Sequence, residues 1–272
     1  MRRVRSKALS PLRGEGWKRG CSATTDHRGA ATQLRGRHLA ADTPTPGPSS
    51  QGGGEAPASD IGRDSERTQL STGDSLSALL AEIRACRACA GELPHPPRPV
   101  VRVTRQTRLL ICGQAPGRRV HESGLPFDDP SGDRLRDWLG IDRQAFYGRP
   151  EIGVAAMAFC FPGTDPKGGD YPPPRRCAAL WRERLLAELP NVELTLLVGG
   201  YAQDWALGRG RPMTEVVRDW RVFGPDVLPL PHPSWRNTGW LKRHPWFEAE
   251  VVPHLRRRAA EILQVGQGAP AP

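Results

Sequence analysis

The sequence contains no apolar run of about 20 residues, the length that a membrane-spanning helix needs. Its first residues carry arginines but lack the apolar segment of a secretory signal peptide. We therefore expect a protein that has no membrane partner and is not exported.

Residues 1–70 have little of the apolar periodicity that a packed core requires. They contain 12 Lys+Arg against 7 Asp+Glu and include a Pro-, Gly- and Ser-rich stretch at 43–54. This composition predicts a disordered basic tail at 1–70. A single domain at 71–266 is long enough to bury a sizeable core, and a short disordered C-terminus is predicted at 267–272.

The whole chain has a formal net charge of +10. A basic chain suits an anionic partner, because phosphate contacts supply most of the non-specific affinity for DNA. An arginine-rich composition explains the charge equally well, so the motifs have to decide whether the chain has a nucleic-acid partner.

Apolar runs alternate with segments of helical periodicity from residue 74 onward. Helices are predicted to begin at Asp74 or Ser75, at Ser131 and at 175, and a last one follows Pro245 and is kinked or restarts at Pro253. Strands are predicted at 107–112, 152–158, 194–198 and 226–230. Strands separated by helices predict an α/β fold, a single three-layer α/β/α domain with a short central parallel sheet. In such sheets, ligands bind beyond the carboxyl ends of the strands.

Four cysteines have the number and spacing of a metal-binding set: Cys86, Cys89, Cys160 and Cys177. Thiolates in this number can hold an iron–sulfur cluster or a zinc ion, and the cluster is preferred. The alternative is a set of scattered buried thiols. Metal-bound rather than paired thiols indicate a reducing cytoplasm. Cys21 and Cys112 are left over.

Two loops carry further chemistry. Gly113-Gln114-Ala115-Pro116-Gly117 follows the first strand, where its glycines let the backbone approach a ligand and direct N–H groups at negative charge. An ordinary strand-to-helix turn is the alternative. The second loop, His232-Pro233-Ser234-Trp235-Arg236-Asn237, places a hydrogen-bond donor after the last strand.

The order of these motifs resembles the uracil-DNA glycosylase superfamily over roughly residues 76–264, and most closely its iron–sulfur (family 4-like) branch in bacteria and archaea. The resemblance implies that residues 113–117 form the water-activating motif and that Phe127 stacks on the flipped base. It implies that His232 stabilises the departing base and that Ser234, Trp235, Arg236 and Asn237 form the loop that enters the DNA. It also implies a [4Fe-4S] cluster on the four cysteines and a monomeric protein of the bacterial cytoplasm that acts on single- or double-stranded DNA.

Two departures from the family pattern matter. Gln114 stands where the iron–sulfur relatives have a glutamate, and Ala115 stands where other members have an aspartate. A glutamine can orient water but cannot take a proton, so His121, Glu122 and Asp128 are further candidates for the base. Gln114→Glu is predicted to preserve or raise activity. Residues 155–158 contain no asparagine to recognise the uracil edge, so another deaminated base is also a candidate substrate.

The sequence therefore predicts a DNA-repair glycosylase that hydrolyses the N-glycosidic bond of uracil or another deaminated base flipped out of DNA, with a structural cluster. The alternative is a non-catalytic nucleic-acid-binding homologue that keeps the cluster. A small iron–sulfur redox protein would leave the His232 loop unexplained.

Overall fold

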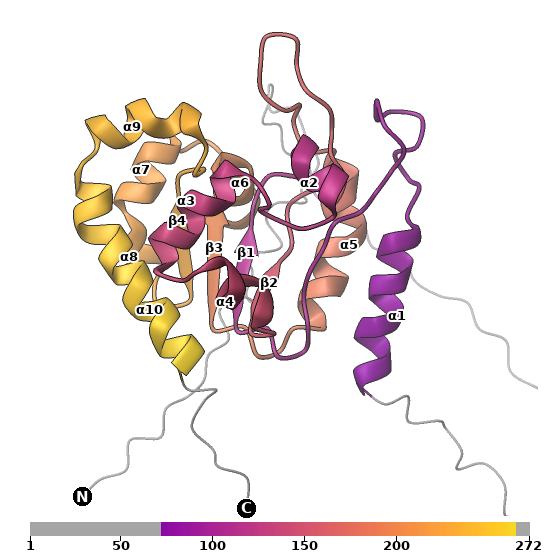
Figure 1. Ribbon diagram of the computed structural model, residues 1–272, viewed down its shortest axis with the longest axis horizontal. Coiled ribbons are helices and arrows are strands. Elements are labelled where there is room, and N and C mark those ends of the chain that lie inside the picture. The colour runs from indigo at the N-terminus through magenta and orange to yellow at the C-terminus, as the bar shows by residue number, and fades with distance from the viewer. Residues whose placement is uncertain (1–71, 265–272) are drawn as a thin grey trace, which may run out of the picture. The chain divides into compact units, whose positions relative to one another are not determined.

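The computed structural model describes residues 72–264. The predicted tail at 1–70 and the C-terminus at 267–272 lie outside the described residues and stay predictions. A sheet of four parallel strands, in the order β2-β1-β3-β4, lies at the centre of the described part (Figure 1). The strands are β1 (Leu109–Cys112), β2 (Ile152–Val154), β3 (Leu194–Val198) and β4 (Val227–Leu230).

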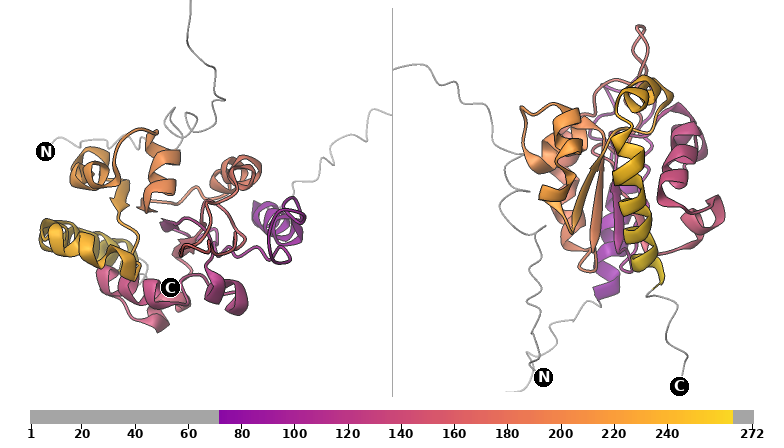
Figure 2. Two further views of the ribbon diagram at one scale, coloured as in Figure 1. Left: turned by 90° about the horizontal axis from the view of Figure 1, so that it is seen from above. Right: turned by 90° about the vertical axis from the view of Figure 1, so that its left-hand side faces the viewer.

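The strands form where short apolar runs are buried on both faces. Leu109 and Ile111 of β1 pack into one core, and Leu110 and Cys112 pack into the other. This alternation follows from the two-residue repeat of a strand. Because helices cover both faces, the predicted three-layer α/β/α fold is confirmed (Figure 2).

The helices divide between the two layers. The core that includes Cys112 is covered by α1 (Thr72–Ala85), α5 (Arg175–Ala187) and α6 (Gly200–Leu207). The other core is covered by α3 (Pro130–Leu139), α4 (Arg143–Gly148), α7 (Met213–Arg218), α8 (Trp220–Phe223), α9 (Thr238–Arg243), a π-helical turn (Phe247–Val251) and α10 (Val252–Gln264). A short helix, α2 (Arg118–Ser123), follows the loop after β1.

Several predicted boundaries need correction. β2 ends at Val154 rather than at 158, because the N–H groups of Met157 and Ala158 donate to the carbonyls of Gly113 and Gln114 at 2.8 and 3.1 Å. Residues 155–158 therefore join the loop after β1 instead of extending the strand.

The start of α3 also differs from the prediction. Asp129, not Ser131, caps this helix, because its carboxylate accepts a hydrogen bond from Gly132 N at 2.8 Å. Pro130 occupies the first turn, where its missing N–H leaves no hydrogen bond unmade. The helix ends at Leu139, and Gly140 follows as its cap with a left-handed φ of 69°.

Other differences lie near the ends of the described range. Cys86 and Cys89 follow the end of α1 at Ala85, and α10 begins at Val252, one residue before Pro253. The short helices α2, α4, α6, α7, α8 and α9 were not predicted, because one or two turns give too few apolar residues for a periodic pattern. Within residues 72–264, no helix is long and apolar enough to cross a membrane.

Candidate functional site

The loops that carry the predicted site leave the sheet at the carboxyl ends of its strands. β1 lies between β2 and β3, and the register pairs Ile111 with both Val154 and Leu196. The loop 113–117 follows β1, and His232 follows β4. The sequence-predicted loops therefore meet at the end of the sheet where parallel α/β folds bind ligands.

His232 is held in one orientation by its own loop. Ser234 N donates to His232 Nδ1 at 3.3 Å, and Asn237 Nδ2 donates to His232 O at 2.7 Å. Gly199 directly follows β3 and has a φ of 86°, and a Cβ built there would lie 3.4 Å from His232 Cβ, so the backbone after β3 passes close to this side chain.

The protonation state of His232 follows from these contacts. Burial lowers the pKa of His232, and attraction to the nearby Asp129 opposes this only in part. The ring is therefore neutral near pH 7. Because Nδ1 accepts from a backbone N–H, the ring proton lies on Nε2. His232 thus offers a neutral N–H donor.

Phe127 lies against the loop after β1. A Cβ built on Gly113 would lie 3.5 Å from Phe127 Cζ, so the ring rests on the glycine backbone. Phe127 has a φ of 57°, and Arg136 donates to its carbonyl at 3.2 Å. A Cβ on Gly132 would lie 1.8 Å from that carbonyl oxygen, so only glycine fits here. The start of α3 therefore fixes the position of the ring.

Two carboxylates that the sequence did not reveal face Gly117. From a Cβ built at this glycine, Asp170 Oδ2 would be 3.5 Å away and Asp129 Oδ2 3.9 Å away. Asp129 acts electrostatically on both His232 and Asp170. The capping pattern before α3 was a signal for Asp129, whereas nothing local in the sequence indicates Asp170.

We refer to Gly113, Gly117, Phe127, Asp129, Asp170 and His232 as the strand-end site. Ala115 and Pro116 complete the loop after β1, and Pro116 is buried while Ala115 is partly exposed.

The side chains of Gln114 and His121, which are predicted to orient or activate water, contact other protein groups. Gln114 Nε2 donates to the carbonyl of Tyr171 at 3.1 Å. The His121 ring packs against the rings of His95 and Phe161, with centroids 5.4 and 5.9 Å away. Burial, with repulsion from His95 next, lowers the pKa of His121. Its role as a base stays a prediction.

The residues after His232 divide into two groups. Ser234 and Asn237 orient His232, and Ser234 O accepts from Arg134 at 2.9 Å. Trp235 is 73% exposed, with the Arg236 guanidinium 5.3 Å from its ring centroid. The same guanidinium would lie 3.0 Å from a Cβ on Gly169, so Arg236 reaches the loop 163–171. Trp235 is thus a largely solvent-exposed aromatic side chain of this loop.

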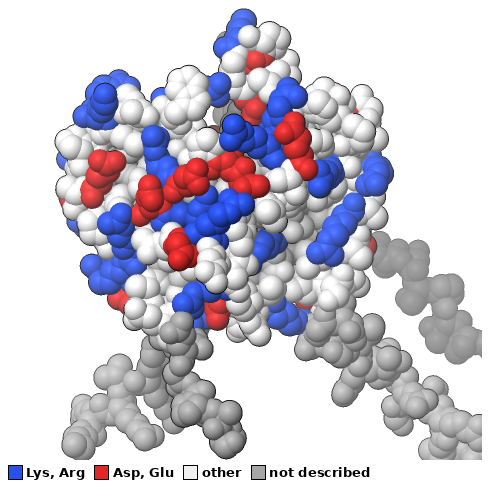
Figure 3. Space-filling model, in the orientation of Figure 1, with Lys and Arg blue, Asp and Glu red and all other residues white. Residues whose placement is uncertain are grey.

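Charge is mixed on the face that Figure 3 shows. Basic and acidic side chains lie next to one another there, and no uninterrupted basic patch covers this face. The net positive charge of the chain therefore does not by itself mark a DNA-binding surface on this side.

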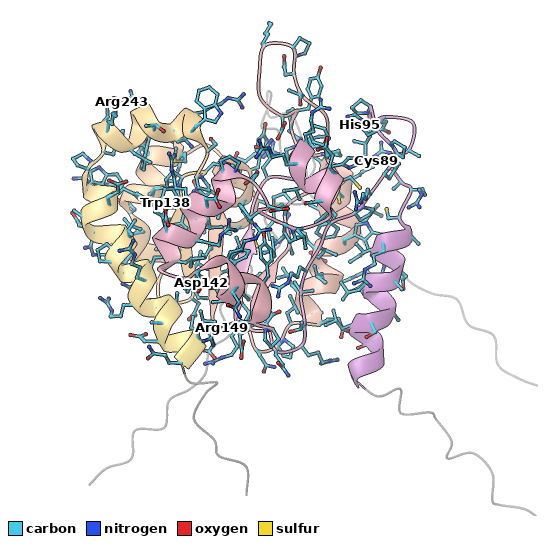
Figure 4. The ribbon with its side chains drawn as sticks, viewed as in Figure 1. Cys89, His95, Trp138, Asp142, Arg149 and Arg243 are labelled. Carbon is cyan, nitrogen blue, oxygen red and sulfur yellow. The ribbon has the colours of Figure 1, made fainter. Side chains whose placement is uncertain are left out.

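The four predicted ligands line a single pocket. Cys86, Cys89, Cys160 and Cys177 share it with apolar side chains that include Ile83, Leu93, Pro97, Pro99, Phe159, Leu180 and Trp181. Figure 4 shows Cys89 and His95 on the segment beyond the end of α1. We call this the cysteine pocket. All four side chains are free thiols, and burial raises the pKa of Cys160 to about 11 and that of Cys177 to about 12.

The side chains that could hold a metal group here are thiols. Four of them, from three chain segments, line one largely apolar pocket, and thiolates are ligands for both iron–sulfur clusters and zinc. Among the described residues, no three His, Cys, Asp or Glu side chains are arranged around one metal ion. Cys112 lies elsewhere, with its Sγ 3.0 Å from Arg182, and Cys21 lies outside the described residues.

Comparison with known proteins adds two findings. A sequence model of the uracil DNA glycosylase superfamily matches residues 101–256, a range that includes both loops of the strand-end site. A solved NMR structure of a candidate uracil DNA glycosylase from Methanosarcina acetivorans is similar to this chain at 18% identity and a TM-score of 0.35. That match covers 57% of this chain and 93% of the other.

Proposed function

The chain belongs to the uracil DNA glycosylase superfamily, and on that premise we propose that it is a DNA-repair glycosylase. It would hydrolyse the N-glycosidic bond of uracil or another deaminated base that is flipped out of DNA. The observation that carries this proposal is the neutral Nε2–H donor of His232 at a site that also holds Phe127 and two carboxylates.

His232 would act on the base as it leaves. When the bond between C1′ and the base nitrogen breaks, its electron pair stays with the base, and negative charge develops on the ring oxygens. A neutral N–H donor at such an oxygen stabilises the transition state more than the ground state. The lowered pKa of His232 keeps the ring in the donor form without an added proton.

Phe127 would hold the flipped base in place. Its ring is fixed against Gly113 by the close packing of Gly132 on its backbone. Stacking on a fixed aromatic face favours an unpaired base without selecting one base from another.

Asp129 and Asp170 would act on the sugar side. Loss of the base leaves a sugar with oxocarbenium character, which negative charge nearby stabilises. Water then attacks C1′, and one of the carboxylates facing Gly117 can accept its proton.

Recognition of the base edge is the least constrained step. The N–H groups of Met157 and Ala158 are already used by the carbonyls of Gly113 and Gln114. Residues 155–158 also lack the asparagine that would recognise the uracil edge. Both observations support the inclusion of other deaminated bases as substrates.

We also propose that Cys86, Cys89, Cys160 and Cys177 hold a [4Fe-4S] cluster, with zinc as the less favoured occupant. The support is the donor set and its apolar surroundings. The group would supply a cross-link that joins the end of α1 and the segment at Cys160 to the start of α5. This role is structural, and no chemical step depends on it.

A panel of oligonucleotides tests the proposed activity. Single- and double-stranded substrates with uracil, hypoxanthine or xanthine at one site are incubated with the full chain, and strand scission after alkali is measured against a thymine control. Release from at least one deaminated base is expected. If none is released while the same oligonucleotides bind, the glycosylase proposal is wrong and the chain is a non-catalytic DNA-binding homologue.

A further inference from the structure

Resting on the proposed function, we propose that Asp170 is the carboxylate that takes the proton of the attacking water. In the same proposal Gln114 is a positioning residue that holds Asp170 in place through Tyr171. The starting point is that Gln114 cannot accept a proton and that its amide nitrogen already binds the Tyr171 carbonyl at 3.1 Å.

The loop that carries Asp170 is closed at its base. Tyr171 N donates to Gly163 O at 2.9 Å, and Thr164 and Asp170 form an antiparallel bridge. Within the loop, Asp165 N donates to Gly169 O at 2.7 Å. Figure 1 shows the loop between β2 and α5 standing out beyond the end of the sheet. Asp170 is therefore at the neck of the loop, next to the residue that Gln114 binds, and not at its tip.

The carboxylate of Asp170 points to the loop after β1. Its Oδ2 would be 3.5 Å from a Cβ on Gly117, so the carboxylate lies beside the backbone of that loop. The charged groups that act on Asp170 are Arg236, Asp129 and Arg118, and the Thr164 hydroxyl donates to it.

The electrostatic surroundings favour a proton acceptor. Desolvation raises the pKa of Asp170 above its ordinary value, and repulsion from Asp129 adds to this, while Arg236, Thr164 and Arg118 act against it. A carboxylate with a raised pKa is a stronger base once ionised.

Asp129 is assigned a different role. One of its oxygens is used to cap α3 through Gly132 N, and its charge acts on His232. Asp129 is therefore suited to stabilise positive charge on the sugar.

The proposed step balances in bonds and protons. The glycosidic electron pair leaves with the base, and the water oxygen bonds to C1′. The water proton passes to Asp170 and then to the base anion or to solvent.

The hydrogen bond from Gln114 to the Tyr171 carbonyl also explains why residue 114 is a glutamine rather than a glutamate. The Gln114 NH₂ group donates to a carbonyl, whereas a glutamate would place a second acceptor against Tyr171 O. We therefore expect Gln114→Glu to lower activity, opposite to the expectation from sequence alone.

The first test measures single-turnover base release and DNA affinity on the best substrate. Asp170→Asn is expected to slow release by about 10²–10⁴-fold, the usual contribution of a general base, with DNA affinity nearly unchanged. Gln114→Glu should also slow release. Asp165→Asn is the matched control, because it lies in the same loop and its side chain only accepts from Lys167 N; its rate should equal that of the parent.

The pH profile separates a base from a merely structural residue. The base must be ionised, so the rate should fall as pH drops through the raised pKa of Asp170. In Asp170→Asn this acid limb should disappear. Parental rates and an unchanged acid limb in Asp170→Asn would overturn the assignment while leaving the glycosylase proposal intact.

A second test does not depend on activity. Hydrogen exchange of the amides in 163–171 is compared between the parent and Gln114→Glu, and faster exchange in the variant is expected. Unchanged exchange would overturn the positioning role of Gln114. If the parent releases no base, the role of Asp170 falls with the proposed function, and the exchange result still decides the role of Gln114.

Discussion

The strand-end site and the cysteine pocket are built in opposite ways. The strand-end site combines polar side chains, Phe127 and two glycines on loops beyond the carboxyl ends of the strands, and specific hydrogen bonds or close backbone contacts orient its side chains. The cysteine pocket lies among helix ends and loops outside the sheet and is lined mostly by apolar side chains. The first arrangement suits chemistry on a bound ligand, and the second suits a buried cross-link.

One segment joins the two regions. Cys160 lines the cysteine pocket, Phe161 packs on His95 and His121, and the chain then forms the loop that brings Asp170 to Gly117. The comparison therefore predicts that changes in one region act on chemistry and changes in the other act on stability, unless they are transmitted through residues 160–171.

Apart from the Asp170 test above, the largest expected effect is at His232. His232→Ala should slow base release by about 10²–10³-fold, as removal of one oxyanion-type donor does, with little change in DNA affinity or melting temperature. His254→Ala on α10 is the control and should keep the parental rate. Single-turnover kinetics and thermal unfolding are measured on the same samples. A parental rate in His232→Ala would show that the strand-end site is not the catalytic centre.

A change in the cysteine pocket should lower stability and leave the rate of base release nearly unchanged. The double substitution Cys86→Ser and Cys89→Ser is expected to abolish bound iron and to lower the free energy of unfolding by about 2–4 kcal/mol, by analogy with other cross-links. The rate of base release by the folded fraction should change little. Cys112→Ala, a buried thiol outside the pocket, should destabilise the fold without loss of iron. Less than one iron per chain in the anaerobically purified parent would contradict the cluster.

Gly132→Ala is expected to affect both stability and chemistry. The new Cβ would lie 1.8 Å from Phe127 O, so the backbone of Phe127 must shift. We expect a loss of about 1–3 kcal/mol in stability from overpacking, with slower base release. Gly148→Ala is the control, since no described atom lies within 4 Å of a Cβ there. If Gly132→Ala unfolds more readily yet loses no activity, Phe127 does not hold the base.

The smallest expected effect is at Trp235. Because this side chain is 73% exposed, Trp235→Ala should leave stability unchanged. Loss of one stacking contact is worth about 1–3 kcal/mol, and we expect the low end, about a fivefold to tenfold loss on duplex substrates. Single strands need no opening, so their rate should change less. Equal losses on both would assign Trp235 to general DNA affinity.

Much of the framework follows from local sequence patterns. Apolar runs predicted the parallel α/β sheet, with β3 at the predicted residues 194–198, and the motif order predicted the superfamily that the family match confirms. β2 was predicted too long, because residues 155–158 are as apolar as a strand but bond to the loop after β1. The domain boundaries at 70 and 266, the cluster and the catalytic roles stay predictions.

The sequence by itself determined the four strands, the longer helices, the family and the choice of four cysteines, because periodicity and residue spacing are local properties of a chain. The partners within the site were decided only by the tertiary structure. Asp129 and Asp170 are far apart in sequence but face the same glycine, and Gln114 binds the backbone of Tyr171. Such contacts depend on how loops from different strands meet, and a hydrogen bond to a distant backbone carbonyl leaves no pattern in the residues that make it.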